Sequence, residues 1–202
     1  YLAAEPLSTD ALAQRAGEVP TRSEERTQLA SPSFEGSFFL IDPLDGTKEF
    51  VAGRDEFTDN LALVTSGVPL LGIVAAPALG LLWRGIVGRG AERLRFDGAT
   101  IGAAEPVHTR KLPAPGEPWV AAVSRSHGDP QSEAFIDNRP HAVRRTVGSA
   151  VKFGRSAEGR AGIYPRFGAT SVGEFGGRRG GGNAARGTVT VRQGGGSPCR
   201  QR

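Results

Sequence analysis

The sequence predicts an α+β protein in which a largely antiparallel sheet is followed by a smaller α/β lobe. Apolar runs between residues 37 and 96 come in pairs joined by turn residues, as in antiparallel hairpins. After residue 119, strand-like and helix-like segments alternate instead. Residues 104–118 contain four prolines and separate the two patterns. We therefore expect a first lobe over residues 1–105, a second over 106–175 and a tail over 176–202.

The elements of the first lobe follow from local signals. Ser8-Thr9-Asp10 is a plausible N-cap for a short helix over residues 11–17, and residues 18–36 are loop-like. An apolar strand over residues 37–41 comes next. Two further strand pairs are expected, over residues 60–65 with 69–76 and residues 81–87 with 91–96.

The second lobe shows a strand–helix–strand rhythm. Strands are expected over residues 119–123, 141–146 and 161–164, and helices over residues 131–138 and from 148 to about 158. This rhythm predicts an α/β layer that packs against the first lobe.

The basic charge of the chain is concentrated in its last residues. Residues 175–202 hold six arginines and no acid, which leaves 19 basic against 21 acidic groups in the remainder. No aromatic residue follows Phe175, so the tail lacks the stacking platforms of a single-strand nucleic-acid binder. We expect a disordered tail and no specific nucleic-acid partner.

Other features of composition point to a cytoplasmic protein. The single cysteine, Cys199, excludes a disulfide framework and fits a reducing compartment. No apolar run is long enough to span a bilayer, and the first residues lack a basic signal-peptide flank. Peripheral association with the inner membrane face and the oligomeric state stay open. Because the chain contains no methionine, we expect a fragment or an incomplete gene product.

The most informative segment is Phe38–Phe50, with the sequence FFLIDPLDGTKEF. Asp42 and Asp45 follow an apolar strand, and Pro43 and Gly46 favour a tight turn after Ile41. Such a turn would present two carboxylates and the Leu44 carbonyl, which are ligands that Mg²⁺ prefers. Thr47 adds a hydroxyl that could orient a water molecule. The alternative is an ordinary surface turn, since Asp, Pro and Gly are common turn residues.

Two other acidic motifs do not fit this segment. An EF-hand loop needs a glutamate at its twelfth position, and position 53 is Gly53. Phosphatases with an aspartyl nucleophile carry one residue between their two acids, whereas two residues separate Asp42 from Asp45. The spacing favours attack by a metal-held water.

Further segments make a family resemblance specific. Together with the Asp42–Phe50 motif, they resemble the inositol monophosphatase-like family and, within it, the CysQ-type 3'(2'),5'-bisphosphate nucleotidases. The resemblance covers about residues 20–174 and implies a layered αβαβα sandwich that is incomplete at both ends. The matching segments are Ser23-Glu24-Glu25, Glu56–Leu63, Gly72–Pro77, Ser124–His127, Gly148-Ser149 and Tyr164–Gly168.

The resemblance also implies metal-site roles. Asp42 resembles the carboxylate that bridges two cations and Asp45 the ligand of the second, while Leu44 contributes its carbonyl. Glu24 resembles the first metal carboxylate, with Glu25 as the fallback if the register slips by one. Two or more Mg²⁺ ions would be bound, and Asp42, Asp45 and Thr47 would be the catalytic residues. The segment contains no nucleophile, so in-line attack by water is expected.

The implied substrate is a phosphorylated nucleotide. Ser124, His127, Ser149, Lys152 and Arg166 lie in segments that surround the second phosphate and the base in the nucleotidases. Gly148-Ser149 at a helix start would supply N–H donors, and the two cationic side chains would counter the phosphate charge. His127, Arg125 and Arg166 read equally well as solvated surface groups. The substrate set also includes Glu24, Leu44, Asp45, Gly46, Thr47 and Glu174.

Two departures from the family pattern weaken the expectation of activity. Gly173 and Glu174 stand where the family has a Trp-Asp pair whose Asp binds metal, and Gly/Arg-rich sequence follows. We interpret this change as a shifted reading frame. Upstream, no Thr-x-x-Asp element precedes Glu24.

The expected activity is Mg²⁺-dependent removal of the 3'-phosphate from adenosine 3',5'-bisphosphate or its sulfated precursor, in sulfur assimilation. An inositol monophosphatase-type activity and a catalytically inactive homologue are the alternatives.

Overall fold

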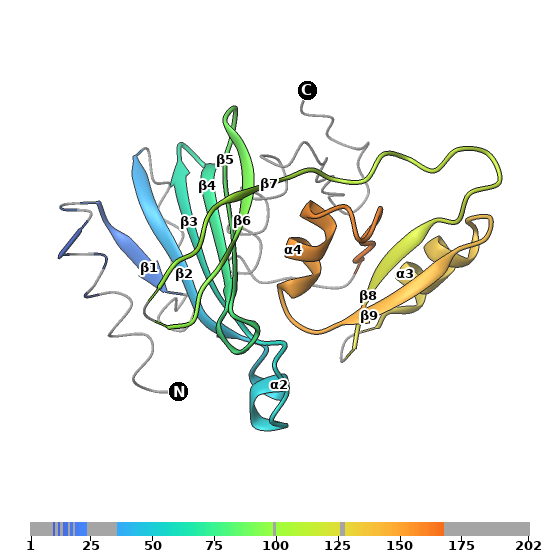
Figure 1. The fold of residues 1–202 in the computed structure, drawn as a ribbon, viewed down its shortest axis with the longest axis horizontal. Helices are drawn as coiled ribbons and strands as arrows, with labels where there is room; N and C mark the ends of the chain where they lie inside the picture. Colours follow the sequence, from blue (N-terminus) through green and yellow to red (C-terminus); the bar gives the residue numbers. More distant parts are fainter. Residues whose placement is uncertain are drawn as a thin grey trace.

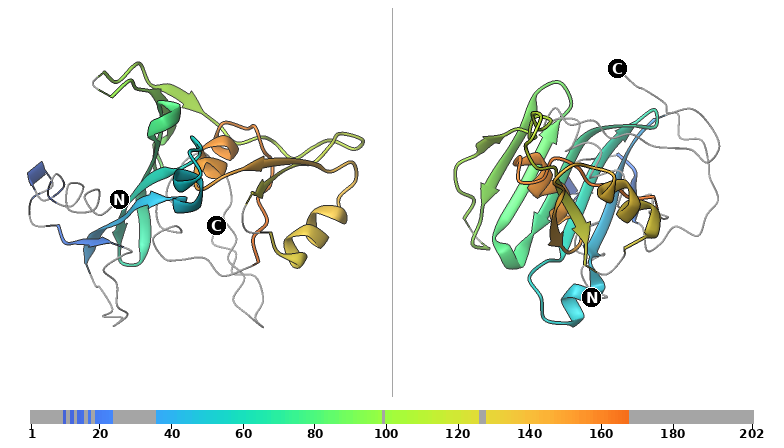
Figure 2. Two further views of the ribbon diagram at one scale, coloured as in Figure 1. Left: turned by 90° about the horizontal axis from the view of Figure 1, so that it is seen from below. Right: turned by 90° about the vertical axis from the view of Figure 1, so that its right-hand side faces the viewer.

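Two sheets with a short helix between them make up the fold. The computed structural model describes residues 10, 12, 14, 15, 17, 19–23, 36–98, 100–125 and 128–167. A seven-stranded sheet has the strand order β1-β2-β3-β4-β5-β6-β7, and a second sheet pairs β8 with β9 (Figure 1). Helix α4 (Val151–Ala157) lies between the two sheets in both Figure 1 and the left view of Figure 2. The predicted α+β class is confirmed.

The seven-stranded sheet is antiparallel except for β1, which pairs with β2 in parallel. Both predicted hairpins are confirmed, β3 with β4 and β5 with β6. The sequence reasoning missed β1 and β7, two three-residue strands that are too short to show an alternating pattern. Since β7 pairs with β6, the first sheet extends past residue 105. The strands are β1 (Thr21–Ser23), β2 (Ser37–Asp45), β3 (Thr58–Thr65), β4 (Val68–Ala76), β5 (Leu81–Ile86), β6 (Gly90–Arg95) and β7 (Glu105–Val107).

Strand β2 continues through the predicted metal turn. Asp42 lies opposite Asn60 and Asp45 opposite Thr58, so that two residues of β2, Pro43 and Leu44, face one residue of β3. This two-against-one pairing is a β-bulge, a feature that bends a strand and redirects its side chains. Proline fits a bulge because it has no N–H to donate to the ladder. The expected tight turn after Ile41 is therefore wrong, and a bulge takes its place.

The second lobe contains β8 (Val120–Ser124), α3 (Pro130–Asp137), β9 (Val143–Val147) and α4, all of which were predicted. Strands β8 and β9 are parallel, with Ser124 opposite Val147 at their carboxyl ends. The side chain of Asp129 caps α3 by accepting from the Ser132 N–H at 2.7 Å. The strand expected over residues 161–164 is reduced to one bridge between Ile163 and Ala121.

Helix α4 packs closely on the seven-stranded sheet. Its first residues join Val74 and Trp83 in one buried cluster. Gly154 makes this approach possible, because a Cβ at that position would lie 2.4 Å from the Trp83 ring. The indole Nε1 of Trp83 in turn donates to Glu158, just beyond the end of α4, at 2.8 Å.

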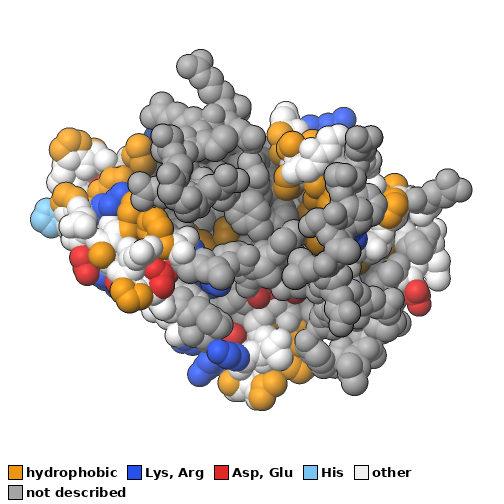
Figure 3. Space-filling view, turned by 180° about the vertical axis from the view of Figure 1, so that it is seen from behind, with side chains coloured by type: hydrophobic (Ala, Val, Ile, Leu, Met, Phe, Trp, Pro, Cys, Tyr) orange, Lys and Arg blue, Asp and Glu red, His pale blue; other side chains and the backbone are white. Residues whose placement is uncertain are grey.

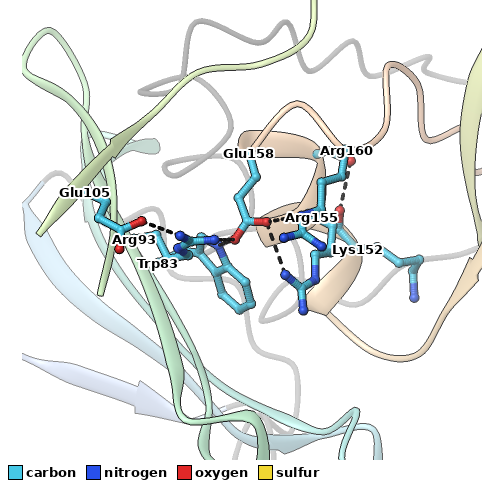
Figure 4. A network of polar contacts seen from close by, with 8 residues as sticks. Trp83, Arg93, Glu105, Lys152, Arg155, Glu158 and Arg160 are labelled. Atoms are coloured by element: carbon cyan, nitrogen blue, oxygen red, sulfur yellow. Dashed lines mark hydrogen bonds and ion pairs between the residues drawn. The ribbon is translucent and has the colours of Figure 1, made fainter. Parts of the chain in front are cut away.

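Glu158 also gathers three arginines around its buried carboxylate (Figure 4). Arg93 approaches from β6 at 3.3 Å, Arg155 from α4 at 3.2 Å and Arg160 from the following turn at 2.9 Å. Hydrogen bonding to Glu105 on β7 raises the pKa of Arg93 above its ordinary value, so Arg93 stays charged. The network ties the end of α4 to strands β5, β6 and β7.

The remaining predictions concern the termini, the charge and the membrane. The predicted first helix is present at its described positions Leu12, Gln14 and Arg15, and Asp10 is helical too. The tail over 176–202 lies outside the described residues.

Seen from behind, both basic and acidic side chains stand among apolar and neutral ones, so the described atoms of that face form no patch of one charge (Figure 3). Within the described part of the chain, no helix is both long enough and apolar enough to cross a bilayer.

Candidate metal and phosphate site

The bulge in β2 places its carboxylates beside polar residues of β3. Asp42 is only 8% exposed, and the Asn60 side-chain amide donates to its Oδ2 at a long 3.4 Å. Leu44 adopts the left-handed region, with φ at 66°, and its N–H donates to the Asp59 carboxylate at 3.0 Å. A left-handed conformation costs a residue with a Cβ about 1–2 kcal/mol, so the buried Leu44 side chain and the Asp59 contact stabilise it.

Asp45 reaches across to the second lobe. Its Oδ2 accepts from the Ser149 hydroxyl at 2.6 Å and from the Ala150 N–H at 2.9 Å. The Ser149 hydroxyl also lies 2.8 Å from the Thr58 hydroxyl. The carboxylate at the end of β2 therefore holds the residues just before α4, which we call the 148–150 turn (Gly148, Ser149 and Ala150).

Two glycines allow this close approach. Gly46 has φ at 94°, and a Cβ there would lie 2.8 Å from Ser149 Cβ. At Gly148 a Cβ would lie 2.9 Å from the side chains of Glu49 and Glu56. A side chain at either position would push the two halves of the site apart.

The carboxyl ends of the parallel strands β8 and β9 meet at the same place. Ser124 ends β8, and the 148–150 turn follows β9. Arg125, next after Ser124, donates to Glu56 Oε2 at 2.8 Å. The same oxygen accepts from the Gly148 N–H at 2.8 Å. The Gly148 N–H, which was expected to face a phosphate, thus donates to Glu56, and the Ala150 N–H donates to Asp45.

Lys152 lies beneath the turn. Its side chain is buried, and its Nζ donates to the Ser149 carbonyl at 2.6 Å and to the Val147 carbonyl at 3.4 Å. The Tyr164 ring centroid lies 5.5 Å from Nζ, and Arg166 donates to the Tyr164 hydroxyl at 3.4 Å. These contacts connect Lys152 to backbone carbonyls of the 148–150 turn and of the residue before it.

The residues present fit a hard cation in kind. Asp42, Asp45 and the Leu44 carbonyl offer only oxygen, which suits Mg²⁺. Asn60 is 1% exposed, and its Oδ1 has no hydrogen-bond partner among the described residues, so acceptor capacity remains beside Asp42. Thr47 donates to the Leu44 carbonyl at 3.5 Å, which is a weak contact.

The structure describes only part of the predicted ligand set. Among the described residues, no three His, Cys, Asp or Glu side chains are grouped so that they could hold a metal. The predicted ligands Glu24 and Glu174, the fallback Glu25 and the predicted substrate residue His127 all lie outside those residues. Their roles stay predictions.

Sequence reasoning gave no role to four residues that shape this site, namely Glu56, Thr58, Asp59 and Asn60. One signal was available: Thr58 and Asn60 share a face of β3 with the apolar residues Ala62 and Val64. Polar residues that continue an otherwise apolar, buried face of a strand indicate a polar site on that face. Glu56 has no comparable signal, because its partners lie 69 and 92 residues away.

Comparisons with known proteins show the family of this chain. A sequence profile of the inositol monophosphatase family matches residues 2–174. The 3'(2'),5'-bisphosphate nucleotidase CysQ of Escherichia coli K12 is 32% identical over 176 residues, which cover 85% of this chain and 66% of that protein. The chain therefore spans slightly less than two thirds of that relative's length.

Solved structures show the same fold. CysQ from Bacteroides thetaiotaomicron superposes with a TM-score of 0.73 at 27% identity, over 87% of this chain and 70% of that one. Inositol monophosphatase II from Staphylococcus aureus superposes with a TM-score of 0.70 at 20% identity, over 93% and 70% of the two chains. The second likeness concerns the fold alone.

Proposed function

Because this chain belongs to the inositol monophosphatase family, we propose that it is a Mg²⁺-dependent phosphomonoesterase that removes the 3'-phosphate from adenosine 3',5'-bisphosphate. We choose the bisphosphate nucleotide over other phosphomonoesters because CysQ nucleotidases resemble this chain both in sequence and in fold. The cytoplasmic location and the role in sulfur assimilation expected from the sequence are part of this proposal.

One observation carries the proposal. The bulged end of β2 carries Asp42, the Leu44 carbonyl and Asp45, and Asp45 accepts from Ser149 just after β9. The segment proposed to bind a cation thus contacts, through Asp45, a segment proposed to bind the nucleotide.

The residues of this chain would divide the work as follows. Asp42, Asp45 and the Leu44 carbonyl would hold Mg²⁺, with Glu24 and Glu174 as the further proposed carboxylates. When bound, Mg²⁺ would neutralise the phosphoryl oxygens and lower the pKa of the attacking water. Thr47 would orient that water through its hydroxyl, which reaches the Leu44 carbonyl.

The second lobe would bind the rest of the substrate. Ser124, His127, Ser149, Lys152 and Arg166 stay the proposed contacts to the second phosphate and the base. Lys152 also donates to the Ser149 and Val147 carbonyls and so supports the 148–150 turn.

A substrate panel tests this proposal. Phosphate release is measured with adenosine 3',5'-bisphosphate, with inositol 1-phosphate and with adenosine 5'-monophosphate, each with Mg²⁺ and with EDTA. The proposal expects Mg²⁺-dependent release from the bisphosphate at a kcat/KM at least about tenfold above that for the other two. A preference for inositol 1-phosphate would replace the nucleotide by the inositol activity, and no release from any of the three would refute a phosphatase.

A further inference from the structure

Glu56 connects the two lobes at the edge of the candidate site. It lies between α2 (Thr47–Val51) and β3, and a single carboxylate oxygen, Oε2, accepts from the Gly148 N–H and from Arg125, each at 2.8 Å. Its side chain is 24% exposed and that of Arg125 is 39% exposed, so the pair stands where the site meets solvent. Glu56 also packs directly on the Gly148 backbone, where a Cβ would collide with it.

The contact between Glu56 and Gly148 affects Asp45 because the two residues after Gly148 both contact Asp45. Gly148 is held by Glu56, and Ser149 and Ala150 donate to Asp45 Oδ2. Ser149 adopts a left-handed conformation, with φ at 42°. Such a conformation persists only where surrounding contacts define it, so the turn depends on anchors at both ends.

Arg125 has a different relation to the turn. Within the described part of the chain its side chain pairs with the Glu56 carboxylate, so it acts on the turn by keeping that carboxylate in place. The ion pair also offsets one negative charge at a site that already holds Asp42 and Asp45, where an anionic substrate must approach.

We infer that Glu56 is a positioning residue, which sets the 148–150 turn against Asp45 while Arg125 holds its carboxylate. The expected effect of Glu56 on kcat rests on the proposed phosphatase function. The expected effect of Glu56 on the 148–150 turn does not.

Kinetics with adenosine 3',5'-bisphosphate test the first effect. Glu56→Ala removes the acceptor for Gly148 and should lower kcat by about 10- to 100-fold, with KM changed by less than about threefold, since a small misplacement in an active site is costly. Glu56→Gln keeps an oxygen for the Gly148 N–H and should stay within about threefold of the wild type in kcat. The matched control is Glu92→Ala, which breaks the exposed ion pair with Arg84 on the sheet and should leave kcat unchanged.

A double-mutant cycle tests the role of Arg125. Because Arg125 acts through Glu56, the variant carrying both Glu56→Ala and Arg125→Ala should be no slower than Glu56→Ala alone. Additive losses in kcat would contradict the inference, as would equal losses in Glu56→Ala and Glu56→Gln.

Amide hydrogen exchange tests the effect on the turn without any turnover. Glu56→Ala should speed exchange at the Ala150 N–H by at least about tenfold, Glu56→Gln should not, and the amide of Ala62 in the middle of β3 should be unaffected in both. An unchanged Ala150 amide in Glu56→Ala would overturn the inference. If the wild type releases no phosphate, the proposed function fails, and this exchange measurement alone decides the role of Glu56.

Discussion

Asp45 offers the sharpest test of how the candidate site is built, because it is both a proposed metal ligand and the contact between the lobes. Two substitutions separate these properties. Asp45→Asn and Asp45→Ala both remove the charge, and only Asn keeps an oxygen that can accept from Ser149 and Ala150. Any change in repulsion with Asp42 is therefore common to both variants. The difference between them isolates the hydrogen bonds.

The size of this difference follows from the partners left behind. In Asp45→Ala the Thr58 hydroxyl can donate to Ser149 Oγ, 2.8 Å away, and the Ser149 hydroxyl can donate to the backbone carbonyl of residue 45 at 2.9 Å. The Ala150 N–H loses its acceptor in a residue that is 0% exposed. An orphaned buried donor costs about 1–3 kcal/mol, so Asp45→Ala should be less stable than Asp45→Asn by about 2 kcal/mol.

Urea unfolding without Mg²⁺, followed by fluorescence, measures this difference. Trp83 reports on the interface because it is buried against α4. The exposed Asp55 supplies the control pair, and Asp55→Asn and Asp55→Ala should agree within about 0.5 kcal/mol. Equal stability of Asp45→Asn and Asp45→Ala would show that Asp45 does not hold the turn. Added Mg²⁺ should stabilise the wild type by about 2.7 kcal/mol at a hundred times its Kd, and neither Asp45 variant.

Two further predictions concern the packing of α4 on the sheet. Gly154→Ala should destabilise the protein by about 1–2 kcal/mol in urea unfolding, because a Cβ placed 2.4 Å from the Trp83 ring outweighs the better helix propensity of alanine. Gly128→Ala, which meets nothing within 4 Å, is the control, and equal stability of the two variants would contradict this reading. Glu158→Gln should cost about 1–3 kcal/mol, because it leaves Arg93 and the other arginines of the network without their carboxylate. Because the pKa of Arg93 is raised, its charge and this loss should be the same from about pH 6 to pH 9 in thermal unfolding, and a loss confined to one end of that range would refute the assignment.

The hairpins could be predicted because their information is local. Short apolar runs fall within β3 and β5, and turn residues such as Ser66-Gly67 lie between β3 and β4. The bulge in β2 could not, because Pro43 and Gly46 are equally compatible with a turn. The choice between a turn and a bulge depends on how β2 pairs with β3. Asp45 pairs with Thr58, which is one residue away from the partner that an unbroken register would give it.

The same distinction applies to the site. Asp42, Leu44, Asp45 and the 148–150 turn could be predicted, because their residue types and spacing match a family pattern. The contacts between them could not be predicted: Asp45 and Ser149 are 104 residues apart, and nothing near either residue in the sequence indicates the pairing. The hydrogen bonds from Lys152 to the Val147 and Ser149 carbonyls were likewise not predicted from the sequence.

The proposed Mg²⁺-dependent activity is tested by phosphate release from adenosine 3',5'-bisphosphate, measured for the wild type and for Asp42→Asn across a Mg²⁺ titration. Asp42 is buried at the bulge, and asparagine keeps its shape while removing the charge that a cation needs. We expect phosphate release by the wild type to rise with the Mg²⁺ concentration. In Asp42→Asn the rate of release should be at least about 100-fold lower. Release that is independent of Mg²⁺, or equal in the two proteins, would contradict the proposed activity.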